Sequence, residues 1–228
     1  MESEQRKNAI RGAYHLTGSN NFYDGMITCS TFSGKAVCRM VWAMNRHECE
    51  EYLSKALSGI PEDFAGTMLE VPVGTGILTM PVYQTLPKAD VTCLDYSPDM
   101  MGQEKAEKLH LTNVKFQQGD VGALPFADGE FDLVLSLNGF HAFPDKEAAY
   151  RETFRVLKPG GTFCGCFYVS GEDKRTDWMI RHVYEPTKFF TPPYETVDSL
   201  RKRLQGMYAQ VDVGSLKSIA WFICRKAD

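Results

Sequence analysis

The spacing of apolar residues along this chain changes near residue 65. Before about residue 44, apolar and aromatic residues follow no clean period, which predicts short helical pieces that cover a neighbouring surface. Asn45 then precedes a segment with apolar residues at helical spacing, and Gly59 and Pro61 follow it, so we expect a capped helix between them. The apolar face of this helix is assigned to core packing and consists of Cys49, Tyr52, Leu53, Ala56 and Leu57.

Beyond residue 65, short apolar runs alternate with helical segments. The run 131–137 is almost continuously apolar, as is typical of a strand buried on both faces. A helix predicted over 146–157 ends at a Pro-Gly-Gly turn, and Pro81 makes the helix after the first strand start late or kink. The predicted strands span residues 67–71, 91–94, 114–118, 131–137, 162–169, 210–213 and 219–225.

Strands that alternate with helices form a mainly parallel sheet with right-handed crossovers. The last two strands follow a helix near 197–206 and have no helix between them, which predicts an antiparallel hairpin at one edge. The chain shows no linker and no internal repeat, so we expect one domain over residues 1–228. Its expected parts are an N-terminal helical cover (1–60), a ligand-binding core (65–170), a lid-like insertion (171–194) and a C-terminal helix and hairpin (195–228).

A glycine-containing turn, Gly74-Thr75-Gly76, connects the first strand to the segment that follows it. Glycine permits positive φ and lets a ligand lie against bare backbone, and the start of a helix offers N–H groups that lack partners. The same short turn also occurs where it does no more than connect a strand tightly to a helix. The neighbouring strand ends therefore decide between the two interpretations.

Polar residues follow three further strands, at the edge of the sheet where ligands of doubly wound folds bind. Asp95 comes about twenty residues after the glycine turn and can accept hydrogen bonds from both hydroxyls of a ribose. Its alternative role is to cap the next helix, although Ser97, with Pro98 and Asp99 after it, already has the pattern of a helix start. Asp120 can accept from the exocyclic amine of an adenine or can stabilise a turn.

Two more residues carry candidate chemistry. Glu70 stands inside a buried strand, where an unpaired carboxylate is costly, so a ligand ammonium or a backbone N–H must satisfy it. His141 follows the fourth strand, near Asn138, and is the one candidate for a general base. The alternative for His141 is a packing role in its loop.

Five segments that contain these residues stand in a familiar order and spacing: 69–76, 94–100, 119–126, 131–136 and 155–161. Together they resemble the class I S-adenosylmethionine-dependent methyltransferases, and most of all the small-molecule branch with the ubiquinone/menaquinone-biosynthesis methyltransferases. The resemblance covers about residues 65–170. It implies an α/β, doubly wound, Rossmann-like fold with a seven-stranded, mostly parallel sheet of order 3-2-1-4-5-7-6, in which strand 7 is antiparallel.

The resemblance also implies S-adenosylmethionine as cofactor and a role for each matching residue. Glu70 and the backbone of residues 72–76 would hold the methionine part, and Asp95 would bind the ribose. Tyr96 and Met100 would flank the two sides of the adenine, and Asp120 with Val121 would bind its edge. The family pattern usually has glycine where Pro72 stands, and proline has a fixed φ and no N–H, so we expect a modified cradle. The predicted cofactor-binding residues are Glu70, Val71, Pro72, Gly74, Thr75, Gly76, Asp95, Tyr96, Ser97, Met100, Gly119, Asp120, Val121, Leu137, Asn138 and Gly139.

The function implied is methyl transfer to a small-molecule acceptor by in-line displacement. Residues 14–42 and 178–194 stand outside the regular pattern and are rich in aromatics, so we expect the acceptor pocket there, under a lid. The alternative is that these aromatics simply pack on the edge of the sheet. The candidates for the pocket are Tyr23, Trp42, Trp178, Arg181 and Tyr184.

Two other functions compete with this one. An NAD-binding oxidoreductase would have Gly-x-Gly-x-x-Gly, but Thr79 stands in place of the third glycine. A non-catalytic, cofactor-binding partner protein would bind the cofactor and show no turnover. Binding measurements with both cofactors separate the first alternative from methyl transfer.

The charge and the apolar stretches of the chain limit the partners that we expect it to have. The formal net charge is -4, and no run of Lys or Arg is present, which argues against nucleic acid or an anionic membrane as a partner. No apolar stretch approaches the roughly 20 residues that span a bilayer, so we expect a cytoplasmic protein, for which a homodimer is compatible with the sequence.

The seven cysteines form no Cys-x-x-Cys pair, so we expect no metal site and reduced, structural thiols. A metalloid substrate bound by thiols is the lesser alternative.

Overall fold

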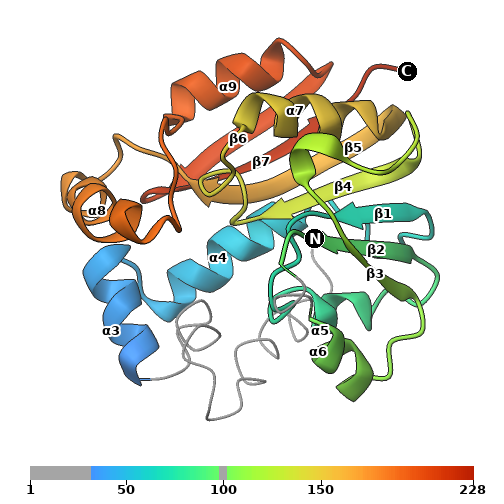
Figure 1. Ribbon diagram of the computed structural model, residues 1–228, viewed down its shortest axis with the longest axis horizontal. Helices are drawn as coiled ribbons and strands as arrows, with labels where there is room; N and C mark the ends of the chain where they lie inside the picture. Colours follow the sequence, from blue (N-terminus) through green and yellow to red (C-terminus); the bar gives the residue numbers. More distant parts are fainter. Residues whose placement is uncertain (1–31, 98–101) are drawn as a thin grey trace.

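A seven-stranded sheet runs through the part of the chain that the computed structural model describes, residues 32–97 and 102–228. Helices lie on both of its faces (Figure 1). The strands, in the labels of Figure 1, are β1 (Thr67–Glu70), β2 (Asp90–Asp95), β3 (Val114–Gln118), β4 (Phe131–Leu137), β5 (Leu157–Tyr168), β6 (Gln210–Leu216) and β7 (Ile219–Arg225).

The strand order is β3-β2-β1-β4-β5-β7-β6, which confirms the predicted order. Strands β1 to β5 pair in parallel, whereas β7 is antiparallel to both β5 and β6. A two-residue turn at Lys217 and Ser218 closes the hairpin of β6 and β7, with Lys217 in the left-handed region at φ 52°. The carboxyl ends of β1, β2, β3 and β4 consequently meet at one edge of the sheet.

Two hydrophobic clusters cover the two faces of the sheet. One lies under α4 (Arg46–Leu57), α5 (Met80–Tyr83) and α6 (Gln103–Lys108), and the other under α7 (Lys146–Arg155) and α9 (Val197–Gln205) (Figure 1). Neighbouring strand residues alternate between the clusters, as the period of two requires. In β4, for example, Leu133 and Leu135 belong to the first cluster and Val134 to the second.

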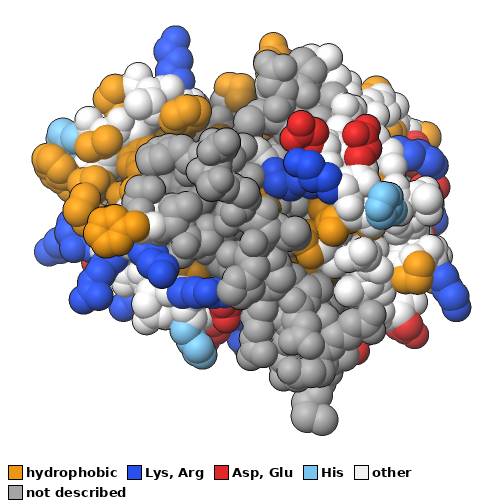
Figure 2. Space-filling model, turned by 90° about the horizontal axis from the view of Figure 1, so that it is seen from below, with side chains coloured by type: hydrophobic (Ala, Val, Ile, Leu, Met, Phe, Trp, Pro, Cys, Tyr) orange, Lys and Arg blue, Asp and Glu red, His pale blue; other side chains and the backbone are white. Residues whose placement is uncertain are grey.

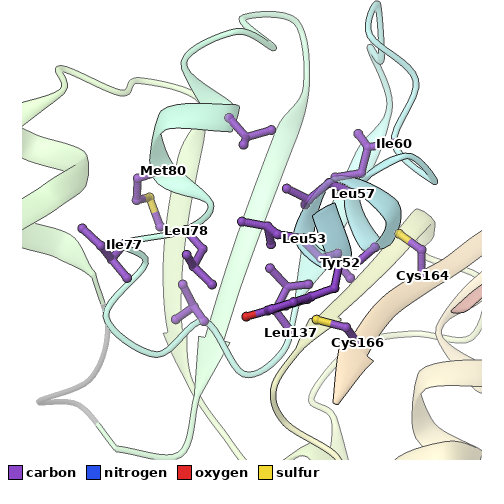
Figure 3. Close-up of a cluster of buried hydrophobic side chains, with 14 of the residues drawn as sticks. Tyr52, Leu53, Leu57, Ile60, Ile77, Leu78, Met80, Leu137, Cys164 and Cys166 are labelled. Carbon is purple, nitrogen blue, oxygen red and sulfur yellow. The ribbon is translucent and has the colours of Figure 1, made fainter. Parts of the chain in front are cut away.

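Helix α4 begins with the cap predicted from the sequence. The side chain of Asn45 accepts a hydrogen bond from the Glu48 backbone N–H (3.0 Å), and the Glu48 carboxylate accepts one from the Asn45 N–H (2.8 Å). The five predicted core positions of α4 are all buried. Figure 3 shows Tyr52 of this helix beside Leu137 of β4 and Cys166 of β5, so α4 reaches the carboxyl edge of the sheet.

The insertion after β5 packs beside the helix α3 (Phe32–Val41). It consists of α8 (Lys174–Met179), a π-helical turn η3 (Ile180–Tyr184) and a 3-10 turn η4 (Glu185–Thr187). Thr176 donates to the Val41 carbonyl (2.6 Å), and Arg175 donates to the Arg39 carbonyl (2.9 Å). These bonds join two segments that are far apart in the sequence into one cover at an end of the sheet (Figure 1).

The helix after β1 starts late, at Met80, with Pro81 in its first turn, which confirms the predicted late start, and it spans only four residues. A second predicted element differs from the structure. Strand β5 already begins at Leu157, before the predicted Pro-Gly-Gly stop. The register of β5 shifts there, since Phe131 pairs with Leu157 and Leu133 with Thr162. The predicted helix start at Pro98 and Asp99 lies outside the described residues.

Of the six cysteines in the described part of the chain, five follow the prediction, and Cys29 lies outside it. Five are buried thiols, namely Cys49, Cys93, Cys164, Cys166 and Cys224. Cys38 is disulfide-bonded, so the expectation of reduced thiols throughout is wrong at this residue. Within the described ranges, no helix combines the length and the apolar character needed to cross a membrane.

The packing of α4 leads to a stability prediction. Leu53 is fully buried, so Leu53→Ala removes apolar contacts and leaves a cavity, which should lower the free energy of unfolding by about 2–5 kcal/mol. Urea denaturation followed by circular dichroism measures the change. Glu51→Ala on the exposed face of the same helix is the control and should change stability by less than about 0.5 kcal/mol. Equal effects of both substitutions would contradict the assignment of α4 to the core.

Candidate active site at the strand ends

Two cavities lie at the carboxyl ends of the central strands, and both include Asn138 in their lining. The turn cavity, about 60 Å³, is lined by Glu70, residues 72–79, Leu137 and Asn138. The aromatic cavity has a volume of about 120 Å³. Its described lining residues are Cys38, Trp42, Met44, Cys49, Tyr52, Asn138, His141, Tyr184, Phe190 and Ile219.

The glycines of the turn have the conformation that their residue type allows. Gly74 and Gly76 have φ of 55° and 65°, in the left-handed region. A Cβ added to Gly74 would meet nothing within 4 Å, whereas one on Gly76 would lie 2.8 Å from Cε of Met80. Open space therefore lies in front of Gly74, while Gly76 is required for close packing behind the turn.

Asp95 holds this turn in place. Its Oδ2 accepts a hydrogen bond from the Gly74 backbone N–H (2.8 Å), and its Oδ1 accepts one from the Ser97 N–H (3.0 Å). The side chain is buried at 8% exposure, although it is absent from the described lining of the turn cavity. Each carboxylate oxygen has a further lone pair, so Asp95 can also accept from a ligand.

Asp120 lies next to Asp95, at the end of β3. The Gly119 N–H donates to the Asp95 carbonyl (3.0 Å), and Asp120 Oδ1 accepts from the Gly122 N–H (2.8 Å) at the start of η2 (Val121–Ala123). The carboxylate is exposed and contributes to neither cavity lining. Of the remaining predicted adenine contacts, Tyr96 is 76% exposed, and Met100 lies outside the described residues.

Glu70 is the buried acid of the turn cavity. Its Oε2 accepts hydrogen bonds from the Tyr83 hydroxyl (2.7 Å), the Thr79 hydroxyl (3.0 Å) and the Cys93 thiol (3.6 Å). Burial raises the pKa of Glu70 to about 8, although the three hydrogen bonds act in the opposite direction. Oε1 accepts no hydrogen bond from the residues that the structure describes. Glu70 is therefore mostly protonated at neutral pH and keeps one oxygen for a further partner.

The partners of Glu70 were missed at the sequence level, where a ligand ammonium or a backbone N–H was expected. Thr79 and Tyr83 stand four residues apart, which is the spacing of one helical face. This pair of hydroxyl residues just after the glycine turn is the signal that could have identified them.

Pro72 is accommodated by a glycine from another strand end. A Cβ on Gly139 would lie 2.4 Å from Cδ of Pro72, so only glycine fits beside the proline ring. The peptide bond between Val71 and Pro72 is cis. Val71 is buried and pairs through its N–H with the Leu135 carbonyl (2.9 Å), which places Pro72 at the wall of the turn cavity.

His141 has a defined orientation and protonation state. Its Nδ1 accepts a hydrogen bond from the Tyr168 backbone N–H (3.3 Å), so the proton of the neutral ring is on Nε2. Burial, with a smaller effect of the Lys146 ammonium, lowers the pKa of His141 to about 3. A ring with this pKa is a weak proton acceptor. His141 is therefore better suited to donate a hydrogen bond from Nε2 than to act as the general base predicted from the sequence.

The insertion is fastened to the loop that carries His141. Phe190 stacks on the His141 ring with centroids 4.2 Å apart. The Thr191 N–H donates to the His141 carbonyl (2.9 Å), and Lys146 donates to the carbonyls of both Phe143 and Thr191. Phe190 is thereby held over one end of the aromatic cavity.

The predicted pocket residues fall into three groups. Trp42 and Tyr184 line the aromatic cavity. Trp178 and Arg181 are exposed and are not among its described lining residues, and Tyr23 lies outside the described part of the chain. Figure 2 shows exposed apolar side chains gathered at the end of the molecule that carries α3 and α8.

Sequence analysis missed the contribution of α4 and β7 to this cavity. Cys49 and Tyr52 were assigned to core packing because their helical spacing marks a buried face, and Ile219 was only placed in the last predicted strand. Periodicity identifies a buried face but does not show whether a cavity lies against it.

Comparison with known proteins identifies part of the chain. Residues 68–161 match the model of a family described as a methyltransferase domain. The matched segment includes Glu70, the glycine turn, Asp95, Asp120, Asn138 and His141, whereas the other described walls of the aromatic cavity come from outside it.

Two named relatives are similar to part of this chain. A demethylmenaquinone methyltransferase of Thermus thermophilus is 42% identical over 96 residues, which cover 41% of this chain and 43% of the relative. A chloroplastic 2-methyl-6-phytyl-1,4-hydroquinone methyltransferase of Oryza sativa is 31% identical over 136 residues, or 59% of this chain and 39% of the relative. The chain thus spans less than half the length of these relatives.

Solved structures share the fold of this chain. The [4+2]-cyclase SpnF superimposes with a TM-score of 0.65 at 17% identity, covering 82% of this chain and 86% of SpnF. The YcgJ protein of Bacillus subtilis superimposes with a TM-score of 0.60 at 17% identity. The match covers 81% of this chain and 100% of YcgJ. Because a cyclase shares the fold, the fold alone does not establish the reaction.

The buried Glu70 leads to a prediction about pH and stability. Between about pH 4.5 and pH 8 the carboxyl is ionised in the unfolded chain and protonated in the folded one. The contribution of Glu70 to the free energy of unfolding is full below about pH 4.5 and is lost as the pH rises through about 8. Within this range the free energy of unfolding falls with a slope that approaches about 1.4 kcal/mol per pH unit. Glu70→Gln should remove this loss, so the variant gains stability relative to the unmodified protein as the pH rises.

Urea denaturation at half-unit steps from pH 4 to 9 measures the difference between the two proteins. Glu51→Gln replaces an exposed carboxylate and is the control. For this variant we expect the difference in the free energy of unfolding from the unmodified protein to stay constant over the pH range. A constant difference for Glu70→Gln as well would show that Glu70 is ionised in the folded protein at neutral pH.

The orientation of His141 can be tested by nuclear magnetic resonance. Long-range ¹⁵N–¹H spectra of labelled protein should show His141 with Nε2 protonated and Nδ1 unprotonated, unchanged down to about pH 4. His141→Gln identifies the signal by its loss. A His141 ring that takes up a second proton near pH 6.5, the usual pKa of histidine, would contradict the buried, neutral ring described above.

Proposed function

We propose that this protein transfers a methyl group from S-adenosylmethionine to a small-molecule acceptor. The observation that carries this proposal is that Asn138 lines two cavities, one formed by the glycine turn and the other by aromatic side chains. The match of residues 68–161 to a methyltransferase domain supports it. Each cavity then corresponds to one of the two reactants, with Asn138 between them.

The residues of the turn cavity fit the cofactor. Open space in front of Gly74 would accept the methionine part. The Glu70 oxygen that has no described partner would accept a hydrogen bond from its ammonium, whose positive charge would lower the pKa of Glu70 and favour the ionised carboxylate. Outside the described lining of this cavity, Asp95 and Asp120 would accept from the ribose hydroxyls and the adenine amine with their remaining lone pairs. When bound, this cofactor supplies a methyl group that is already activated toward nucleophiles by the positive sulfur.

The chain's own contribution is to orient the acceptor and to exclude water. The aromatic cavity can hold an acceptor beside Asn138, and Phe190, fixed through Thr191 and Lys146, covers it. Orientation of this kind can contribute about 7–11 kcal/mol to lowering a barrier. Because His141 is a weak proton acceptor, the acceptor must be nucleophilic without help from this ring.

The structure offers no support for the NAD alternative at the position where a third glycine would stand. Thr79 occupies this position, and its hydroxyl is used in the hydrogen bond to Glu70. The relatives named above are methyltransferases. We therefore retain methyl transfer as the proposed activity.

Calorimetry and an Asp95 variant test the proposed cofactor site. The unmodified protein should bind S-adenosylhomocysteine and not NAD(H). Asp95→Ala should weaken binding about 10- to 100-fold, because it removes a charge-assisted partner and loosens the bond to Gly74. Asp90→Ala, at the opposite end of β2 and exposed, is the matched control and should leave the affinity unchanged.

Turnover tests the reaction itself. The protein is incubated with S-adenosylmethionine and a panel of uncharged small acceptors, and formation of S-adenosylhomocysteine is measured. Binding without turnover on any acceptor would favour the non-catalytic alternative. Binding of NAD(H) in place of S-adenosylhomocysteine would exclude the proposed function.

A further inference from the structure

The aromatic cavity has a composition that restricts what it can bind. We propose that it takes an uncharged molecule of about one aromatic ring, with an oxygen or nitrogen that accepts a hydrogen bond from Nε2–H of His141. This inference rests on the proposed function in so far as the bound molecule is the methyl acceptor. The binding preference itself follows from the cavity.

The size of the cavity sets the first limit. Its volume is about 120 Å³. An engineered apolar cavity of about 150 Å³ in another protein binds benzene, so a volume of this order accommodates about one ring. The hydroquinone in the name of the rice relative carries a phytyl chain, which is far larger than this space. Such a chain would have to extend outside the cavity.

The charge of the lining sets the second limit. None of its described residues is Asp, Glu, Lys or Arg, and His141 is neutral. A charged ligand would lose its water of hydration here and gain no opposite charge in return. Carboxylate and ammonium compounds should consequently be rejected.

The walls favour flat rings. Trp42, Tyr184 and Phe190 all line the cavity, and the ring of Phe190 lies 6.2 Å from that of Trp42 and 5.5 Å from that of Tyr184, measured between centroids. Aromatic neighbours at such distances interact through ring faces and edges, which a planar ligand can continue.

The polar contact is set by His141. Since Nδ1 is occupied by the Tyr168 N–H, the ring presents only an N–H donor to a ligand, at Nε2. No described residue accepts a hydrogen bond from this N–H. An acceptor atom on the ligand would satisfy it, and an apolar ligand of the same shape would leave it without a partner.

Four probe compounds test these limits. Acetophenone is an uncharged single ring with an acceptor oxygen, benzoate is an anion of similar size, ethylbenzene lacks the acceptor, and 2-acetylnaphthalene adds a ring. Calorimetry on the full chain, with and without saturating S-adenosylhomocysteine, measures their binding. We expect acetophenone to bind, benzoate and 2-acetylnaphthalene to bind at least about tenfold more weakly, and ethylbenzene about three- to tenfold more weakly.

Variants assign these preferences to particular residues. Phe190→Ala should enlarge the cavity and bring 2-acetylnaphthalene to the affinity of acetophenone. Phe189→Ala is the matched control, because this neighbouring side chain is 65% exposed and does not line the cavity. His141→Phe keeps a ring against Phe190 and removes the donor, so acetophenone and ethylbenzene should bind equally. Circular dichroism confirms that each variant is folded.

The outcomes separate this inference from the proposed function. If S-adenosylhomocysteine does not bind but the probe preferences hold, the proposed function fails and the description of the cavity stands. If acetophenone does not bind, or benzoate binds as tightly, the inference is overturned whatever the cofactor does. Unchanged discrimination in His141→Phe would remove the proposed hydrogen bond.

Discussion

The hydrogen bonds of Asp95 to the backbone of Gly74 and Ser97 are the interactions on which the site depends. They tie the end of β2 to the turn that follows β1, and both oxygens of a buried carboxylate are used. The turn is held in a conformation with two residues at positive φ, which leaves open space in front of Gly74. A surface capable of holding a ligand is therefore built from the backbone before any ligand is present.

The second constraint is the buried Glu70. Two hydroxyls and a thiol surround one of its oxygens, and they come from the helix after the turn and from β2. Burial favours the protonated form, which is compatible with an apolar core around it. The carboxyl consequently links three elements and still offers one oxygen toward the turn cavity.

The two cavities differ in origin. The turn cavity lies entirely within residues 68–161, the segment that matches a methyltransferase domain. Most of the described lining of the aromatic cavity comes from outside this segment, from α3, α4, the insertion after β5 and the start of β7. The proposed cofactor side thus lies in the segment that matches the family model, whereas most of the proposed acceptor side lies outside that segment.

The sequence by itself determined the strands, their order and the set of polar residues at the strand ends. Apolar periodicity and glycine turns are local signals, and the resemblance in five motifs supplied the topology. Only the tertiary structure decided that Tyr52 and Ile219 line a cavity, that hydroxyl groups satisfy Glu70, and that His141 carries its proton on Nε2. Each of these depends on contacts between segments distant in sequence, whose side-chain positions no local pattern records.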